Sequence, residues 1–80
     1  MPIKLVFLGK LADLAGAGEQ EAAGPLDWPG LLEVLHGPLG EAVRQPRIRL
    51  ALNGAVLPDK TALAAQDGDE IALLPPVSGG

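Results

Sequence analysis

The sequence predicts an α+β domain in which a mixed sheet of about five strands wraps one main helix. Residues 3–10 and 48–53 show the period of two that is typical of strands. Between these stretches, leucines recur at helical spacing after residue 27. Early strands, a central helix and late strands predict a sheet that packs one of its faces against the helix.

The first strand is expected at residues 3–10. Ile3, Leu5 and Phe7 fall on one face, which we assign to the core, and Leu8 falls on the opposite, outward face. The stretch GAGEQEAAGP that follows has glycines on both sides of a short polar segment. This pattern predicts a tight hairpin that leads into a second, weak strand.

One helix is expected next. Asp27 is a favourable N-cap, Pro29 is tolerated in a first turn, and Gly37 with Pro38 ends the helix. The stretch LGEAVRQ adds a further helical turn, which Pro46 ends. The apolar face of the helix consists of three leucines: Leu31, Leu32 and Leu35.

The second half of the chain contains a predicted hairpin. Ile48, Leu50 and Leu52 alternate with residues of the opposite face. Asn53–Gly54 follows, and this dipeptide favours a two-residue turn because both of its positions require positive φ. We therefore expect the third and fourth strands on either side of it.

A last strand is expected at residues 70–74, after a connection with one helical turn and a tight turn at Asp67–Gly68. Ile71 and Leu73 face the core, and Leu74 faces outward. The resulting order of strand, strand, helix and three strands is that of the β-grasp fold. We expect a single domain over residues 1–80, with residues 75–80 as an extended, flexible tail.

Composition excludes several classes of protein. Six Lys and Arg against ten Asp and Glu give a net charge of −4, which is the wrong sign for a nucleic-acid partner. The absence of Cys fits a reducing compartment, so we expect a cytoplasmic protein. Lys4 and Lys10 interrupt the apolar N-terminal stretch, which therefore predicts neither a signal peptide nor a membrane span.

The inventory of reactive side chains is short. The chain has one His, His36, which we expect to interact with the last carbonyls of the helix. Ser78 lies in the tail, so a catalytic triad is not expected. The acidic stretch DGDE lacks the spacing of a calcium loop and is interpreted as a solvated turn. We expect no catalytic machinery, no metal site and no bound cofactor.

The outward face and the tail remain as candidate sites. Leu8, Val56 and Leu74 predict an apolar patch of the kind that marks a protein interface. Pro75 and Pro76 end the last strand and direct the chain away from the sheet.

The final residues give the tail its reach and its width. Val77 to Gly80 span about 13 Å when extended. Gly79 and Gly80 have no side chains, so they could thread a channel too narrow for other residues and leave the terminal carboxylate in another protein's active site; the alternative is a frayed terminus.

These features resemble the MoaD/ThiS family of ubiquitin-like sulfur carriers, and within it the small subunits of molybdopterin synthase. IKLVFLGKLADLAG is similar to the family's first strand, LALNGAVL to its central hairpin, and DGDEIALLPPVSGG to its C-terminal signature. The resemblance covers nearly the whole chain. It implies the ubiquitin-like β-grasp fold.

The resemblance also implies a mechanism. An ATP-dependent activating enzyme adenylates Gly80, and a sulfur donor enzyme converts the adenylate to a thiocarboxylate. The tail, Pro75 to Gly79 with the loaded Gly80, then inserts into the large subunit, where the sulfur passes to cyclic pyranopterin monophosphate for the molybdenum cofactor. The family's hydrophobic contact with the large subunit corresponds here to Leu8, Val56 and Leu74.

Three alternatives stay open at this point. The chain could serve a related sulfur pathway, for thiamine or for tRNA thiolation, or act as a ubiquitin-like modifier joined to lysines. It could also be a β-grasp binding module whose glycines carry no chemistry. The ending PPVSGG favours molybdopterin, because thiamine carriers generally lack the proline pair.

Overall fold

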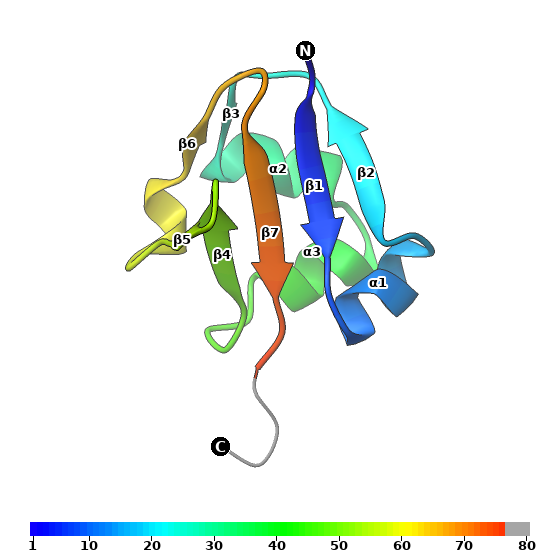
Figure 1. The fold of residues 1–80 in the computed structure, drawn as a ribbon. Coiled ribbons are helices and arrows are strands. Elements are labelled where there is room, and N and C mark those ends of the chain that lie inside the picture. Colours follow the sequence, from blue (N-terminus) through cyan, green and yellow to red (C-terminus); the bar gives the residue numbers. More distant parts are fainter. Residues whose placement is uncertain (77–80) are drawn as a thin grey trace.

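The computed structural model describes residues 1–76, and its main feature is a five-stranded mixed sheet covered on one face by helices (Figure 1). The strand order is β2-β1-β7-β4-β5. β1 and β7 run parallel, and the other neighbours run antiparallel. The predicted fold class is confirmed. The strands of the sheet are β1 (Ile3–Phe7), β2 (Glu19–Ala22), β4 (Arg49–Leu52), β5 (Ala55–Val56) and β7 (Glu70–Leu74).

Smaller elements connect these strands. The helices are α1 (Lys10–Ala15), α2 (Trp28–Val34), α3 (Pro38–Val43) and the 3₁₀ turn η1 (Lys60–Ala62). Two short strands, β3 (Leu26–Asp27) and β6 (Ala64–Ala65), pair with each other in a second sheet. This second sheet was not expected from the sequence.

The core lies between the large sheet and the helices. Alternation along β1, β4 and β7 places every second side chain on the helical face, as expected. Fully burying one such aliphatic side chain stabilises the fold by about 1.5–3 kcal/mol. The largest fully buried side chains of the core are Ile3, Leu5, Leu31, Leu35, Val43, Leu50, Ile71 and Leu73.

The prediction for the first connection is wrong in its length and form. β1 ends at Phe7, three residues before the predicted end, and α1 fills residues 10–15, so the connection to β2 contains a helix before the glycines at which the tight hairpin was expected. Leu11 is buried against the core, which favours the helix. The weak second strand is confirmed as β2, antiparallel to β1.

The predicted helix is confirmed as α2. The Asp27 side chain accepts a hydrogen bond from the N–H of Gly30 at 2.8 Å, as an N-cap does. Pro29 lies in the first turn. The predicted extra turn is α3, which begins at Pro38 and completes the helical layer.

The close approach of α2 and α3 depends on Gly40. A Cβ atom at this position would lie 1.8 Å from the carbonyl oxygen of Leu35. Gly40 is buried, so the neighbouring backbone has little room to move. Only glycine allows the chain to turn from one helix into the other here.

The hairpin at Asn53–Gly54 is confirmed, with φ of 51° and 87° at its two positions. The Asn53 side chain also joins the hairpin to the start of β7. The Asn53 Oδ1 atom accepts from the N–H of Glu70 at 2.9 Å, and its Nδ2 atom donates to Asp69 Oδ1 at 3.1 Å. The turn is therefore part of the sheet's hydrogen-bond network.

The acidic stretch DGDE forms the predicted turn, but two of its carboxylates are hydrogen bonded within the protein. Asp67 Oδ1 accepts from the N–H of Gly24 at 2.7 Å. Asp69 Oδ2 accepts from the N–H of Gln66 at 2.8 Å. This backbone hydrogen bond, and the one from the Asn53 amide, lower the pKa of Asp69 below its ordinary value.

We expect Gly40→Ala to lower the free energy of unfolding by about 1–3 kcal/mol, because the added methyl group overlaps the Leu35 carbonyl. Urea unfolding followed by circular dichroism measures this change. Gly18→Ala is the matched control, because nothing lies within 4 Å of a Cβ at that position. Equal stability of the two variants would contradict the role of Gly40.

We expect Asp69→Asn to lower stability at neutral pH and to change its acid dependence. The pKa of Asp69 is lowered in the folded state, so the ionised carboxylate stabilises the fold above the pKa of the unfolded chain. That stabilisation is lost as pH falls through the folded-state pKa. The stability difference between the two proteins should therefore narrow in acid, as thermal unfolding from pH 7 downward measures.

The control for this experiment is Asp13→Asn, at an exposed position on α1. It removes one carboxylate and keeps the hydrogen bonds that Asp69 makes with Asn53 and Gln66, so it separates the effect of these contacts from that of a lost charge. A constant difference between wild type and Asp69→Asn at every pH would show that the charge of Asp69 has no part in stability.

Candidate functional site

The outer face of the sheet, opposite the helices, carries a row of small and aliphatic side chains. Val6 pairs with Ala72, Ala72 with Ala51, and Ala51 with Val56, so the four residues lie side by side across β1, β7, β4 and β5. Val56 is 52% exposed. This row is apolar from one strand to the next.

Leu8 and Leu74 extend this row toward the end of β7. Phe7 pairs with Leu73 in the parallel pair, so Leu8 follows β1 where Leu74 ends β7. Leu8 is exposed and Leu74 is partly buried. We define the outer apolar face as these two residues and the row beside them, which comprises Val6, Ala51, Val56 and Ala72.

The structure therefore places the three predicted interface residues on one face, with Val56 in the row beside Leu8 and Leu74. Sequence reasoning missed Val6, Ala51 and Ala72, which join the predicted positions to one another. The outward phase of their strands was the available signal. On β2, Glu19 pairs with Val6 and forms an ion pair with Lys4 at 3.0 Å, so charged side chains border the apolar surface on this side of the sheet.

The tail leaves the sheet from a fixed position. Gly9 has a φ of +57°, and a Cβ atom there would lie 3.2 Å from Cγ of Pro75. The Pro75 ring therefore packs on the bare backbone of Gly9. Pro75 is partly buried and Pro76 is exposed. The predicted tail residues Val77, Ser78, Gly79 and Gly80 lie outside the described residues.

We call Pro75, where the chain leaves β7, the tail root. It follows Leu74, which belongs to the outer apolar face. Because β1 and β7 are parallel, both end at the same edge of the sheet, where the antiparallel β4 begins (Figure 1). Leu73 is fully buried and anchors the strand one residue before Leu74. A partner that covers the outer face would therefore also meet the tail where it leaves the sheet.

Reactive side chains do not gather elsewhere in residues 1–76. No group of three or more His, Cys, Asp or Glu in this range is placed to hold a metal ion. The Thr61 hydroxyl donates to Asp59 at 2.6 Å, and Asp59 also accepts from the N–H of Thr61. These hydrogen bonds lower the pKa of Asp59 and cap η1, which is a structural role. In the same range, no helix has the length and apolar character needed to cross a membrane.

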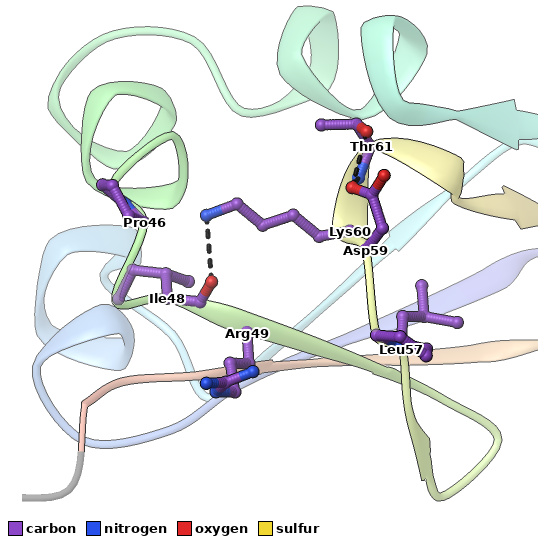
Figure 2. Close-up of a pocket in the computed structure, with 8 residues that line it drawn as sticks. Pro46, Ile48, Arg49, Leu57, Asp59, Lys60 and Thr61 are labelled. Atoms are coloured by element: carbon purple, nitrogen blue, oxygen red, sulfur yellow. Dashed lines mark hydrogen bonds between the residues drawn. The ribbon is translucent and has the colours of Figure 1, made fainter.

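A pocket of about 200 Å³ lies beside the start of β4 (Figure 2). Lys60 forms one wall, and its ammonium donates to the carbonyls of Val43 at 2.8 Å, Ile48 at 2.9 Å and Gln45. The ammonium also lies 5.6 Å from the centre of the Trp28 ring. Lys60 therefore holds the segment between α3 and β4 in place. Its ammonium group is occupied by these contacts within the protein.

Comparison with known proteins identifies relatives along the whole chain. The ThiS family model matches residues 5–80. The molybdopterin synthase sulfur carrier subunit of Chlamydomonas reinhardtii is 31% identical over 85 residues, with all of both chains covered.

Solved structures share the fold. The complex of subunits 1 and 2 of molybdopterin-converting factor from Helicobacter pylori 26695 contains a chain 26% identical, with 100% of both chains covered and a TM-score of 0.68. Small archaeal modifier protein 1 from Methanosarcina acetivorans is 25% identical, with 98% of this chain and 95% of that chain covered and a TM-score of 0.69. The resemblance drawn from the sequence is confirmed, and the chain belongs to the ThiS family of MoaD/ThiS-like β-grasp proteins.

Proposed function

We propose that this chain is the cytoplasmic sulfur-carrier subunit of a molybdopterin synthase, loaded with sulfur at Gly80. The observation that carries the proposal is the similarity, over the full length of both chains, to a subunit named for that activity. The chain has no Cys, so it offers no thiol on which to hold sulfur. The terminal carboxylate is the remaining group that accepts a sulfur atom once another enzyme activates it.

In this proposal the chain supplies position, and its partners supply the chemistry. An activating enzyme uses ATP to adenylate Gly80 and releases pyrophosphate, and sulfur at the oxidation level of sulfide, supplied by a sulfur donor enzyme, displaces AMP from the acyl adenylate to form the thiocarboxylate. Pro75, packed on Gly9, directs the tail away from the sheet. Two prolines and two terminal glycines make the arm stiff at its root and slim at its end.

The outer apolar face supports docking on a large subunit. Its exposed members Leu8 and Val56 are apolar on a small acidic protein, which is typical of a protein interface. The face ends at the tail root, so one docking event covers it and aligns residues 75–80 with the partner's active site. There the thiocarboxylate donates its sulfur to cyclic pyranopterin monophosphate.

The similarity to small archaeal modifier protein 1 favours a second candidate function. The same adenylated Gly80 would then be joined to lysines of other proteins. A carrier for thiamine synthesis or tRNA thiolation would likewise share the loading step and differ in the acceptor. The fate of the loaded tail therefore separates these functions.

Incubation with the activating enzyme, ATP and the sulfur donor enzyme should replace one terminal oxygen atom by sulfur, which the intact mass detects. Adding the large subunit and cyclic pyranopterin monophosphate should return the carrier to its unloaded mass and transfer the sulfur to the pterin. A protein modifier would instead appear as covalent adducts on lysines. An unchanged mass, under conditions that load a known carrier, would contradict the carrier function.

The control is a variant that lacks Gly80. It should fold as the wild type does, because the last residue of a chain contributes little to stability, and it should fail to load. A large fall in its thermal unfolding temperature would show that Gly80 has a structural role.

We expect Pro75→Ala to slow sulfur transfer more than Pro76→Ala does. Both substitutions remove one ring from the tail, but only Pro75 contacts Gly9 and fixes the direction in which the tail leaves. The loss in kcat/KM for Pro75→Ala should be about tenfold, as expected when the reacting group is misplaced. Single-turnover transfer from preloaded carrier measures it. An equal or larger loss for Pro76→Ala would contradict the role of the Gly9 contact.

A further inference from the structure

All three arginines of the chain lie within residues 44–49: Arg44, Arg47 and Arg49. No Asp or Glu occurs between Arg44 and Pro58. The rest of the chain carries three Lys against ten Asp and Glu. A short positive segment is therefore set into a protein that is otherwise strongly negative. We call these three residues the arginine rim.

The arginine rim lies at the end of the sheet from which the tail leaves. Arg49 is the first residue of β4, and it pairs with Leu74, the last residue of β7. Residues 44–48 connect α3 to this point, at the same end of the sheet as the tail root (Figure 1). The positive segment is thus adjacent to both the outer apolar face and Pro75.

The arginine rim is held in place but not neutralised. The Lys60 ammonium binds carbonyls along this segment: those of Val43 and Gln45, on either side of Arg44, and that of Ile48, directly before Arg49. All three arginines are exposed. The one ion pair among residues 1–76 joins Lys4 to Glu19, so no carboxylate of the described residues lies within 4.0 Å of a guanidinium group.

The pocket beside Arg49 adds room for a contact. Its apolar part is formed by Pro46, Ile48, Leu57 and Pro58, its polar part by Asp59, Lys60 and Thr61, and Arg49 borders it (Figure 2). A side chain that enters from a partner would bury its carbons there while its carboxylate reaches the guanidinium. Arginine binds carboxylates with two parallel hydrogen bonds, which makes such a contact directional.

We propose that the arginine rim docks on carboxylates around the channel of the large subunit that receives the tail. This inference rests on the proposed function and names the charge of the partner's surface. Opposite charge at the tail root would orient the acidic carrier, tail first, before the apolar surfaces meet. Charges at the edge of an interface act mainly on the rate of association and on its salt dependence.

The test is the association rate of the full chain with the large subunit of the same organism, measured by stopped-flow fluorescence at several salt concentrations. Arg49→Gln should lower the rate about three- to tenfold at low salt. The difference should disappear near 0.5 M salt, where screening leaves only contact interactions. Arg49→Lys, which keeps the charge, should retain most of the rate.

Lys4→Gln is the matched control, because it removes the same charge from an exposed position on the outer face, away from the tail root. It should change the rate by less than about twofold. Thermal unfolding confirms that each variant is folded.

The outcomes separate this inference from the proposed function. If the wild type binds the large subunit and Arg49→Gln binds at the same rate and with the same salt dependence, the arginine rim has no role and the proposed function stands. Faster association of Arg49→Gln would indicate a basic partner surface and would also overturn the inference. A wild type that does not bind the large subunit at all would overturn both.

Discussion

The parallel pairing of β1 with β7 is the constraint on which the rest of the structure depends. It joins the first strand of the chain to the last and places them at the centre of the sheet. Because parallel strands end at the same edge, the turn after β1 lies beside the end of β7. The contact of Gly9 with Pro75, and the neighbouring positions of Leu8 and Leu74, follow from this pairing.

The alternation of side chains along β1, β4 and β7 forms both faces of the sheet. One set of side chains packs against α2 and α3, and the other forms the outer apolar face. The inner set consists of large side chains that are buried, except for the partly buried Leu52, whereas the outer row includes the small residues Ala51, which is also buried, and Ala72. Only Leu8 and Val56 of this face are exposed large aliphatic side chains, and a small number of exposed aliphatic groups is usual on protein surfaces.

Patterns of neighbouring residues in the sequence predicted those strands and turns that depend on residues close to one another in the chain. The period of two located β1, β4 and β7, and Asn53–Gly54 located the hairpin, because each depends on residues close in sequence. β3 and β6 have two residues each and exist through a pairing that spans almost forty residues, so neither carries a local signal. Helix α1 is six residues long and continues the apolar pattern of β1, which concealed its start.

The candidate site was predicted in part for the same reason. Leu8, Val56 and Leu74 are large enough to be noticed on an outward face, but the alanines between them become part of a surface only through strand register. The turn at Asp67 and Gly68 is exposed as predicted, but the hydrogen bonds of Asp67 with Gly24 and of Asp69 with Asn53 had no local signal because these partners are distant in sequence. The predictions for Val77 to Gly80 stay predictions.

The direction of β1 has a practical consequence for handling the protein. The chain begins at the end of the sheet opposite the tail root, about 17 Å away along a five-residue strand. Met1 is almost fully exposed there, and Pro2 contacts the turn at Gly68. An affinity tag, fluorophore or fused domain attached before Met1 would leave the tail root, the outer apolar face and the arginine rim open, so a genetic fusion at this end is compatible with the loading and docking proposed above.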